Sequence, residues 1–410
     1  MQAVILAGGK SSRFWPLNSF SKCLFKIMGK PIIYWTILAL QKKKIKDIIV
    51  VQPKTKEIEK ELKNFPQFKK IKYVVQKEPK GMGDALWQTK KFLKERFFVL
   101  NTERVDIDEV IEEILLKVKK TKCDAILLGQ KTKTPQFFGI LKLKKDKILK
   151  IIEKPSLKEA PSDIKASGVY FLKKDFFYFY EKTKKHQYDF EDTLSFYMRK
   201  KDVRVFILKK KEKETPSLKF PWDLFGITEY LMKRYLKRKI SQKAEIKKGA
   251  KILGDVLIEK GAVIFGGAVI KGPCFIGENV IVGNNSLVRE FSDIEKNSTV
   301  GALCEVKHSI FEESVSVHSG YFGDSILDRG VKVGAGTITA NVRFDRKEIH
   351  SVVKGEKINT QKKSFGTAIG KNTKIGINVS ILPGVFVGKE CLVYPGKVVE
   401  KNLPDRTILK

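Results

Sequence analysis

Aliphatic residues recur at every sixth position through the second half of the chain. The repeat runs from Ile246 to Val306 without a slip and returns between Ile369 and Val399. A helix repeats near 3.6 residues and a simple strand near two, so neither explains a period of six. A triangular parallel β-helix does, because each side of its coil is about six residues long and points one aliphatic side chain inward. The pattern therefore predicts a left-handed parallel β-helix.

The six-residue phase is broken between residues 307 and 368. A repeat protein tolerates such a break because each coil contacts only its neighbours, and loops on a rigid scaffold commonly carry function. A β-sandwich with chance spacing is the alternative, which the long unbroken phase disfavours. Residues that tolerate left-handed backbone gather where the corners of the coils would lie: Gly249, Gly261, Gly283, Asn284 and Asn285.

In the first half of the chain, strand-like and helix-like patterns alternate. This alternation predicts an α/β domain with a Rossmann-like, doubly wound and mostly parallel sheet, whose phosphate-binding groups lie at the C-terminal ends of the strands. An amphipathic helix at 222–240 leads into the β-helix. The expected domains are therefore 1–235 and 246–410, joined over 236–245 by the end of that helix. The strand patterns cover 2–6, 47–51, 71–76 and 97–100, the helix patterns cover 31–41, 55–64 and 84–96, and residues 133–166 are more strand-like.

The composition indicates in which compartment the protein works and which kinds of partner to expect. The 410 residues carry a formal charge of +35, but the lysines are spread along the chain and no nucleic-acid-binding motif occurs, so we expect solvated lysine-rich faces rather than a nucleic-acid partner. The apolar run at 31–40 is too short to span a bilayer, and no signal peptide is evident. Five scattered cysteines without CxxC spacing indicate a reducing compartment. We expect a cytoplasmic protein without a membrane partner.

A glycine-rich turn follows the first strand, in the sequence Leu6-Ala7-Gly8-Gly9. Backbone N–H groups in such a turn can cradle phosphates. Arg13 and Lys22 follow, and two cations beside an amide nest suit a triphosphate whose α-phosphoryl group is attacked as pyrophosphate leaves. An ordinary surface turn is the alternative reading of this segment.

These residues, with Gly29-Lys30-Pro31, resemble the sugar-1-phosphate nucleotidyltransferases, and the resemblance continues downstream through most of residues 1–230. It implies that Arg13 and Lys22 act in catalysis on the phosphates, and that Gly139 and Glu153 hold the sugar. It also implies Mg²⁺ as the cofactor, UTP or dTTP as the nucleotide and a sugar-1-phosphate as the acceptor. The implied nucleotide-binding residues are Leu6, Ala7, Gly8, Gly9, Lys22, Gln76, Gly81 and Met82.

Four positions depart from this family pattern. Where the family has a Gly-Asp pair that binds Mg²⁺, this chain has Thr102-Glu103. Glu103 is therefore the expected metal ligand, with a side chain longer than that of aspartate. A second ligand is expected near Ser217, in Pro216-Ser217-Leu218. The sugar-binding asparagine appears as Ala166, and a base-side threonine appears as Met82.

The break in the six-residue phase contains a second motif. His318-Ser-Gly-Tyr321-Phe-Gly-Asp is followed by Gly334-Ala-Gly-Thr-Ile-Thr-Ala-Asn341. Acyl transfer from a thioester to a sugar amine needs a base, and histidine titrates in the right range; His318 is the candidate. Tyr321 and Asn341 can donate hydrogen bonds to the sugar or the thioester carbonyl. Arg289, Lys307 and Lys347 supply positive charge for a sugar phosphate.

This motif resembles the acetyltransferase half of the bifunctional N-acetylglucosamine-1-phosphate uridylyltransferases/glucosamine-1-phosphate acetyltransferases, in their archaeal-like form. The resemblance implies acetyl-CoA as co-substrate, bound by Ala335, Asn341, Ile377 and Pro395, and a homotrimer with sites between neighbouring β-helices. The family often has a second lysine after Lys307, where this chain has His308. His186 and His350 have no comparable context.

Three alternatives remain open at this point. One is a glucose-1-phosphate thymidylyl- or uridylyltransferase whose β-helix only forms trimers. The second is a scaffold or regulatory protein with a degenerate, inactive nucleotidyltransferase domain, which Glu103 and Ser217 would favour. The third is a nucleic-acid binder driven by net charge, recognisable by a steep salt dependence.

Overall fold

The structure, a computed structural model, describes residues 1–9, 11–208 and 217–410. Lys10 of the glycine-rich turn and Pro216, beside the expected second metal ligand, lie outside the described residues. The chain forms two compact units. The first contains Met1–Lys10 and Ile32–Pro216, and the second contains Ser11–Pro31 and Ser217–Lys410. The segment Ser11–Pro31 therefore packs with the C-terminal half of the chain, although the sequence places it in the expected first domain.

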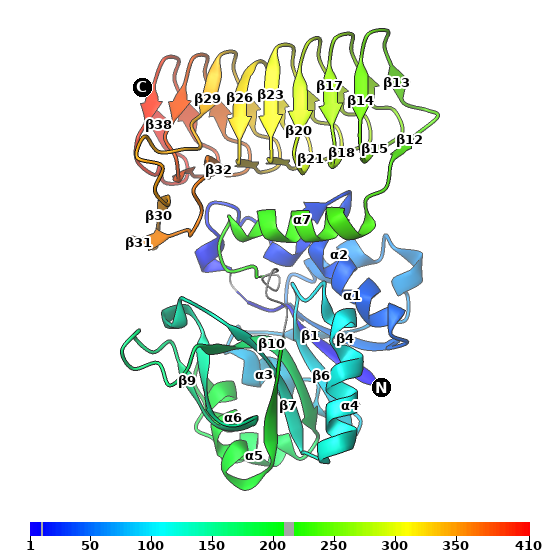
Figure 1. Cartoon of the computed structure of the whole chain (residues 1–410), viewed down its shortest axis with the longest axis vertical. Helices are drawn as coiled ribbons and strands as arrows, with labels where there is room; N and C mark the ends of the chain where they lie inside the picture. Colours follow the sequence, from blue (N-terminus) through cyan, green and yellow to red (C-terminus); the bar gives the residue numbers. More distant parts are fainter. Residues whose placement is uncertain (10, 209–216) are drawn as a thin grey trace. The chain divides into compact units, whose positions relative to one another are not determined.

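The first unit is built on a nine-stranded mixed sheet in the order β5-β4-β1-β6-β10-β7-β11-β9-β8 (Figure 1). Strands β1, β4, β5 and β6 are mutually parallel, and β10 runs antiparallel between β6 and β7. The strands are β1 (Gln2–Leu6), β4 (Asp47–Pro53), β5 (Lys72–Gln76), β6 (Arg96–Asn101), β7 (Ala125–Lys131), β8 (Gly139–Lys144), β9 (Lys147–Glu153), β10 (Ile164–Lys173) and β11 (Val203–Ile207).

Both faces of this sheet are covered, because successive residues of its central strands are buried. Val4 and Val99 pack in one core with Leu86 of α3 and Phe190 of α6. Ile5, the residue after Val4 on β1, faces the other side of the sheet and is also fully buried. This burial on both sides is typical of a doubly wound sheet and confirms the expected α/β fold. The helices of the unit are α1 (Ile32–Lys42), α2 (Glu57–Leu62), α3 (Met82–Trp87), α4 (Ile111–Thr121), α5 (Phe176–Lys182) and α6 (Asp189–Lys200).

Two expected helices differ from the structure. The pattern at 84–96 forms the short α3 and a separate 3-10 turn at Lys90–Phe92. The helix expected at 222–240 is α7 (Asp223–Tyr235), and it ends where Leu236 adopts an extended backbone. Lys239–Ile240 already forms β12, the first strand of the β-helix. The expected helical connector at 236–245 is therefore wrong, because the six-residue spacing extends back one step to Ile240.

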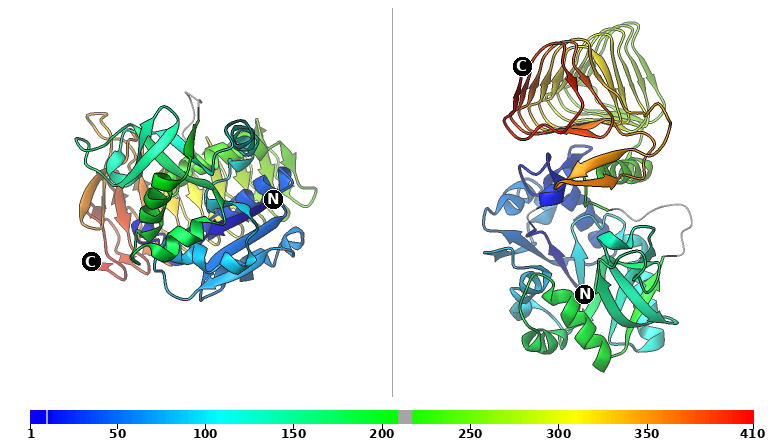
Figure 2. Two further views of the ribbon diagram at one scale, coloured as in Figure 1. Left: turned by 90° about the horizontal axis from the view of Figure 1, so that it is seen from below. Right: turned by 90° about the vertical axis from the view of Figure 1, so that its left-hand side faces the viewer.

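The second unit is a three-sided prism of parallel strands, which Figure 2 shows as stacked coils. Each strand pairs with the strand one coil later, and Ile240, Ile258 and Ile276 succeed one another on one face. The three faces consist of β12-β15-β18-β21-β24-β27-β32-β35 (face one), β13-β16-β19-β22-β25-β28-β33-β36-β38 (face two) and β14-β17-β20-β23-β26-β29-β34-β37 (face three).

The strands of the prism are two to four residues long. Those of face one are β12 (Lys239–Ile240), β15 (Val256–Ile258), β18 (Cys274–Ile276), β21 (Ser292–Ile294), β24 (Ile310–Phe311), β27 (Ile326–Leu327), β32 (Thr367–Ile369) and β35 (Val385–Val387). Those of face two are β13 (Glu245–Ile246), β16 (Val263–Ile264), β19 (Ile281–Val282), β22 (Thr299–Val300), β25 (Ser316–Val317), β28 (Lys332–Val333), β33 (Lys374–Ile375), β36 (Leu392–Val393) and β38 (Ile408–Leu409). Those of face three are β14 (Lys251–Leu253), β17 (Val269–Lys271), β20 (Leu287–Arg289), β23 (Cys304–Lys307), β26 (Gly320–Gly323), β29 (Thr337–Thr339), β34 (Ser380–Ile381) and β37 (Val398–Val399).

The corners of the prism bear out the expected left-handed backbone only in part. Gly249, Gly261 and Asn285 have positive φ. Gly283 and Asn284 do not. Gly283 is required for a different reason: a Cβ there would lie 2.5 Å from the backbone nitrogen of Ala302 on the next coil. At this corner the limit is the close approach of successive coils rather than the backbone angle.

The prism continues through the break in the six-residue phase. Three sides are one residue shorter than usual, those from Val306 to Phe311, from Val317 to Phe322 and from Phe322 to Leu327, and both phenylalanines are fully buried. Their rings meet edge to face at 5.7 Å. The larger rings fill the interior where the coil has lost a residue. The chain then leaves the stack after Thr339 and forms the hairpin β30 (His350–Val353) and β31 (Glu356–Asn359), visible in Figures 1 and 2.

Replacing Phe322 by alanine should destabilise the prism strongly. The fully buried ring would leave a cavity that neighbouring coils cannot close, which costs about 3–5 kcal/mol in the free energy of unfolding. Urea unfolding followed by circular dichroism measures the loss. Leu303→Ala is the matched control, because this leucine is 71% exposed and its removal should change the free energy by less than about 0.5 kcal/mol. Equal stability of the two variants would contradict the inward position of Phe322.

Buried carboxylates on face one hold the segment 11–31. Backbone N–H groups donate to them: Met28 to Asp293 (2.8 Å), Gly29 to Glu295 (2.7 Å) and Lys26 to Glu312 (2.7 Å). Within this segment, Lys26–Ile27 (β2) and Lys30–Pro31 (β3) form a small ladder. Burial raises the pKa of Asp293 to about 7 and that of Glu312 to about 8, the latter opposed by Arg329. The prism thus supplies hydrogen-bond acceptors for the segment 11–31, which the sequence resemblance assigns to the nucleotide site.

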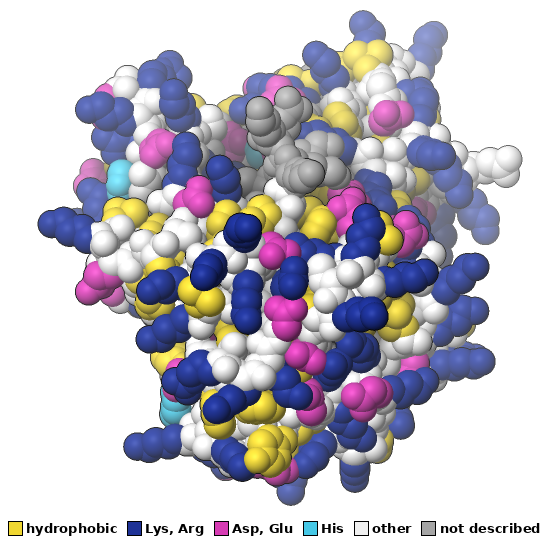
Figure 3. All heavy atoms as spheres, turned by 60° about the horizontal axis from the view of Figure 1, so that its bottom comes forward, with side chains coloured by type: hydrophobic (Ala, Val, Ile, Leu, Met, Phe, Trp, Pro, Cys, Tyr) yellow, Lys and Arg dark blue, Asp and Glu magenta, His cyan; other side chains and the backbone are white. Residues whose placement is uncertain are grey.

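The surface charge is dispersed. On the face shown in Figure 3, Lys and Arg side chains are spread throughout with Asp and Glu between them, rather than gathered in one stripe. Of the helices in the described part of the chain, none combines the length and the apolar character that a membrane crossing needs. All five cysteines are buried.

Candidate functional site

The glycine-rich turn lies at the C-terminal end of β1, between the ends of β4 and β6. Ala7 continues the pairing with β4 by donating to the carbonyl oxygen of Val51 (2.9 Å). A Cβ at Gly8 would lie 2.5 Å from Oε1 of Gln76, whereas Gly9 has open space around it. The turn therefore needs glycine at position 8 because it approaches the side chain of Gln76.

Gln76, at the end of β5, is buried with its amide nitrogen already engaged. Nε2 donates to the carbonyl oxygen of Gly81 (3.1 Å) and to Oδ2 of Asp84 (2.8 Å). Gly81 has a φ of +123°, and a Cβ there would collide with the carbonyl oxygen of Gln187. Met82 is the first residue of α3. The structure thus brings Gln76 to the glycine turn and Gly81 to Gln76, and adds Asp84, whose role sequence reasoning missed.

Glu103 lies just beyond β6, whose last residue Asn101 pairs with Leu6 of β1. Its side chain is buried, and its two carboxylate oxygens accept hydrogen bonds from Asn101 Nδ2 (3.4 Å) and Thr102 Oγ1 (3.2 Å). No group of three or more metal-ligating side chains occurs among residues 1–9, 11–208 and 217–410. One oriented carboxylate still fits Mg²⁺, which proteins often bind through one or two carboxylates together with substrate phosphates and water.

Gly139 and Glu153 face each other across the β8–β9 pair. A Cβ at Gly139 would lie 2.8 Å from Oε2 of Glu153, so the glycine gives this carboxylate its space. Ala166 lies on β10 next to β8, because its neighbour Lys165 pairs with Ile140. The structure therefore brings the three predicted sugar positions together. It also places a second carboxylate, Glu191, near Glu153. Burial raises the pKa of Glu191 to about 8, with a smaller contribution from the charge of Glu153.

Arg13 and Lys22 both belong to the second unit. Arg13 is half-buried in the 3-10 turn Ser12–Phe14, and Nζ of Lys22 donates to the carbonyl oxygen of Leu218 (2.5 Å). Ser217, the position of the expected second metal ligand, has Oγ 3.4 Å from Oδ2 of Asp223. The same carboxylate oxygen accepts from the backbone N–H groups of Lys219 and Phe220, which precede α7. Within this unit, Lys22 is thus tied to the residue that follows Ser217.

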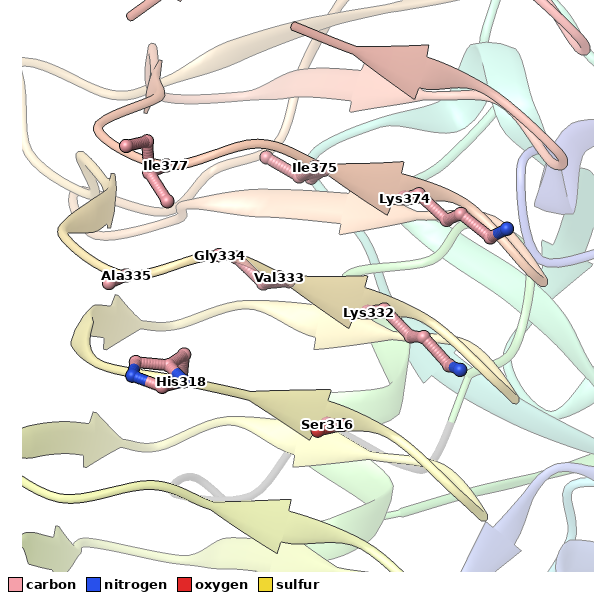
Figure 4. A pocket seen from close by; sticks show the side chains of 9 residues that line it. All are labelled: Ser316, His318, Lys332, Val333, Gly334, Ala335, Lys374, Ile375 and Ile377. Carbon is pink, nitrogen blue, oxygen red and sulfur yellow. The ribbon is translucent and has the colours of Figure 1, made fainter. Parts of the chain in front are cut away.

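A groove of about 380 Å³ crosses face two where the chain enters its phase break. His318, Ala335 and Ile377 line one end of it and Lys332 and Lys374 the other, as Figure 4 shows. His318 is exposed at the end of β25, and the part of the chain that the structure describes offers its ring no hydrogen bond or ion pair. The structure thus places the predicted base beside two predicted acetyl-CoA positions. The two lysines of the groove were not identified from the sequence.

Pro395 lies one coil beyond Ile377, on the same side of the prism. Its backbone nitrogen would be 2.7 Å from a Cβ at Gly376, and Gly396 donates to the carbonyl oxygen of Ile377 (2.9 Å). Lys347 is exposed on the loop after Asn341. The structure does not bring Pro395 or Lys347 to the lining of the groove itself.

A second group of predicted residues meets on face three. Arg289 and Lys307 succeed each other in β20 and β23, and Tyr321 follows in β26. Nδ2 of Asn341 lies 3.2 Å from the hydroxyl of Tyr321 and 2.5 Å from Oδ2 of Asp324. We refer to Arg289, Lys307, Tyr321, Asp324 and Asn341 as the acceptor cluster. Asp324 was quoted in the motif without a role, although it contacts both Asn341 and Lys307.

Carboxylates accompany the cations of the acceptor cluster. Arg289 forms an ion pair with Glu305 (2.7 Å) and a further one with Glu290. Lys307 lies 3.4 Å from Asp324 and 3.8 Å from Glu290. Burial raises the pKa of Asp324, but the hydrogen bond and charge of His308, together with Asn341 and Lys307, outweigh it and lower the pKa below its ordinary value. The cluster can therefore offer both cations to a phosphate and anions to an amine.

Comparison with known proteins extends over the whole chain. The family model described as nucleotidyl transferase matches residues 2–234. A protein of Sulfurisphaera tokodaii named bifunctional sugar-1-phosphate nucleotidylyltransferase/acetyltransferase is 34% identical, with 98% of each chain covered. Proteins named bifunctional protein GlmU from Methanococcus maripaludis and Methanocaldococcus jannaschii are 35% and 33% identical, covering 100% of this chain and 97% of theirs. The chain belongs to the nucleotidyl transferase family and, over its full length, to the family of bifunctional sugar-1-phosphate nucleotidylyltransferases/acetyltransferases.

Proposed function

We propose that this protein carries out two successive steps of UDP-N-acetylglucosamine synthesis. The second unit acetylates glucosamine-1-phosphate with acetyl-CoA, and the chain then transfers UMP from UTP to N-acetylglucosamine-1-phosphate with release of pyrophosphate. The observation that carries this proposal is the groove on face two, where an exposed His318 lies beside Ala335 and Ile377. A β-helix that served only for assembly would have no need of such a groove.

In the acetyl-transfer step, His318 acts as the general base. The sugar amine attacks the thioester carbonyl carbon while its proton passes to the imidazole. The tetrahedral intermediate then expels the thiolate, which takes the proton back from the imidazolium. Arg289, Lys307 and Lys347 bind the sugar phosphate, and Tyr321 and Asn341 orient the sugar. The carboxylates beside these cations favour an acceptor that carries an ammonium group as well as a phosphate.

The groove and the acceptor cluster lie on different faces of one prism. A homotrimer in which the neighbouring β-helix completes the site reconciles this separation, and it is part of the proposal. Large apolar side chains that such an assembly would cover include Ile338 and Phe344, which are exposed in the single chain. Mass measurement in solution by light scattering tests the trimer, and a monomer that acetylates at full rate would contradict it.

The lysines of the groove should bind the anionic part of acetyl-CoA. Replacing Lys374 by glutamate should raise the KM for acetyl-CoA about tenfold while the KM for glucosamine-1-phosphate changes less than about twofold, because only one substrate loses a favourable charge. Steady-state kinetics at 50 and 300 mM salt measure the effect, which should shrink at the higher salt. Lys371→Glu, on the same coil but outside the lining of the groove, is the control. Equal effects of both variants would contradict the assignment.

In the nucleotidyl-transfer step, the glycine turn binds the triphosphate, and Arg13 and Lys22 neutralise charge on the phosphates. Gly139 and Glu153 hold the sugar. Glu103 would hold Mg²⁺, which supplies further charge neutralisation at the phosphates. Since the amide nitrogen of Gln76 is engaged by Asp84, its Oε1 is the atom left to accept from the base. An N3–H donor is present in uracil and thymine but not in cytosine, so UTP and dTTP both fit this contact.

Two separate assays test the proposal. Thiol release from acetyl-CoA with glucosamine-1-phosphate reports the first step, and pyrophosphate release from UTP with N-acetylglucosamine-1-phosphate and Mg²⁺ reports the second. We expect both activities. Failure of thiol release would overturn the acetyltransferase assignment. Pyrophosphate release failing alone would support the second candidate, an acetyltransferase with an inactive nucleotidyltransferase half, which is favoured by Ser217 at the position of an expected metal ligand.

A further inference from the structure

His308 stands where the family commonly has a lysine, at the corner that follows the proposed phosphate ligand Lys307. Both His308 and Asp324, one coil later, have left-handed backbone with a φ of +46°. Their strands are in register, because Lys307 pairs with Gly323. The missing residue in each of these coils tightens the corner. As a consequence, the two side chains leave the prism one above the other.

The ring of His308 is held on three sides. Nδ1 lies 2.7 Å from Oδ1 of Asp324, and Nε2 lies 3.3 Å from Oε1 of Glu229 on α7, at ion-pair distance but without the alignment of a straight hydrogen bond. The face of the ring packs on Phe225 with a centroid distance of 4.7 Å. Because both ring nitrogens face carboxylates, the imidazolium form, with two N–H donors, satisfies the site and the neutral ring does not.

Asp324 divides its two oxygens between His308 and the acceptor cluster. Oδ1 faces His308, whereas Oδ2 accepts from Asn341 (2.5 Å) and lies 3.4 Å from Nζ of Lys307. The carboxylate is almost completely buried, so its rotation is controlled by these contacts. Loss of the Nδ1 contact would free the carboxylate to turn away from Asn341 and Lys307.

We propose that His308 is a positioning residue for acetyl transfer: it orients Asp324, which holds Asn341 and Lys307 to bind the phosphate and sugar of the amino-sugar substrate. This inference rests on the function proposed above for the acceptor cluster. His308 acts through Asp324 and does not itself contact the substrate. Glu229 is the other end of the chain of contacts, so α7 is coupled to the acceptor cluster through one ring.

The charged groups that face His308 are Asp324 from the prism and Glu229 from α7. Lys233 pairs with Glu229 (2.9 Å), and Lys307 pairs with both Asp324 and Glu290. Burial lowers the pKa of His308, but the hydrogen bond to Asp324 and the nearby carboxylate of Glu229 outweigh it, and the pKa is raised above its ordinary value. The imidazolium contribution is therefore complete below the ordinary pKa of about 6.5 and is lost as the pH rises through the raised pKa of the folded protein.

Two substitutions separate the hydrogen-bonding role of His308 from its packing role. His308→Phe keeps a ring on Phe225 but has no donor, whereas His308→Lys keeps a cation and donors without the ring. We expect His308→Phe to raise the KM for glucosamine-1-phosphate about tenfold, as for the loss of one charge-assisted hydrogen bond. The kcat and the KM for acetyl-CoA should change less than about threefold. His308→Lys should restore the KM, and this KM should stay constant to about pH 9, because an ammonium group titrates higher.

His350→Phe is the matched control, since His350 is exposed on β30 outside the network. An unchanged KM for glucosamine-1-phosphate in His308→Phe would overturn the inference. A loss in His308→Lys that His308→Phe does not show, seen as lower thermal stability with kcat and KM altered together, would also overturn it, because it would indicate a packing role only.

A second measurement is independent of the acetylation assay. The amides of Phe365 and Gly366 donate to the carbonyl oxygens of Asn341 (2.8 Å) and Asp324 (2.9 Å). If His308 orients these residues, both amides should exchange with solvent about tenfold faster in His308→Phe than in the unaltered protein at pH 7, and not in His350→Phe. Unchanged exchange overturns the positioning role. Absence of acetylation by the unaltered protein would instead overturn the proposed function, so the two failures are distinguishable.

Discussion

Replacing His318 by alanine is expected to reduce acetyl transfer by about 10²–10⁴-fold, the range that a general base supplies. The effect should lie in kcat, because the ring has no hydrogen bond or ion pair among the described residues and other residues are proposed to bind both substrates. The free energy of unfolding should change less than about 0.5 kcal/mol, since the side chain is exposed. Initial rates of thiol release and urea unfolding give the two quantities.

The nucleotidyl-transfer rate of His318→Ala serves as an internal control and should remain unchanged. His350→Ala is the matched variant, an exposed histidine on β30 that has no place in the groove. If His318→Ala retained acetyl transfer within a few-fold of the unaltered protein, another group would have to take the amine proton. His318 would then line the groove without taking part in the reaction.

Replacing Glu103 by alanine is expected to lower nucleotidyl transfer about a hundredfold or more. This carboxylate is the proposed protein ligand for Mg²⁺ at the end of β6, and a metal contact at a transferring phosphate contributes several kcal/mol to the barrier. Higher Mg²⁺ concentrations should recover part of the rate. Pyrophosphate release measured against Mg²⁺ concentration reports both effects.

Glu103→Asp tests the geometry of the same ligand. The shorter side chain should bind Mg²⁺ with an altered affinity and retain more activity than alanine, while acetyl transfer stays unchanged in both variants. Glu109→Ala, with its carboxylate farther along the chain on the last residue of the 3-10 turn Ile107–Glu109, is the control. A rate for Glu103→Ala equal to that of the control would show that the metal, or the activity itself, does not depend on this carboxylate.

The six-residue aliphatic spacing was sufficient to predict the parallel β-helix, because a triangular coil with one inward side chain per side imposes that period. The strand and helix patterns of the first half likewise predicted β1, β4, β5 and β6, since β1, β4 and β6 are short buried runs and β5 is a short, half-buried run at the sheet edge. The motif around His318 predicted a site at the break, and the structure places that histidine at the end of β25, in the groove with Ala335 and Ile377.

The spacing was less informative where coils lose a residue. The sequence shows only a lost phase between 307 and 368, whereas the prism continues through Phe311 and Phe322. A shorter side with a larger inward ring encloses the same interior. The spacing of apolar residues along the sequence cannot distinguish such a side from a loop. The missed extension back to Ile240 has a related cause: a two-residue strand at the end of a helix pattern carries too little periodicity to be recognised.

The sequence by itself determined the class of both folds and most of the residues that the sites would need, because these follow from periodicity and from motifs that are contiguous along the chain. Only the tertiary structure decided which charges meet. It placed His308 between Asp324 and Glu229, which are 16 and 79 positions away, and it packed the segment 11–31 on carboxylates of face one. Such contacts depend on coil register and on the path of the returning chain, neither of which leaves a local pattern in the sequence.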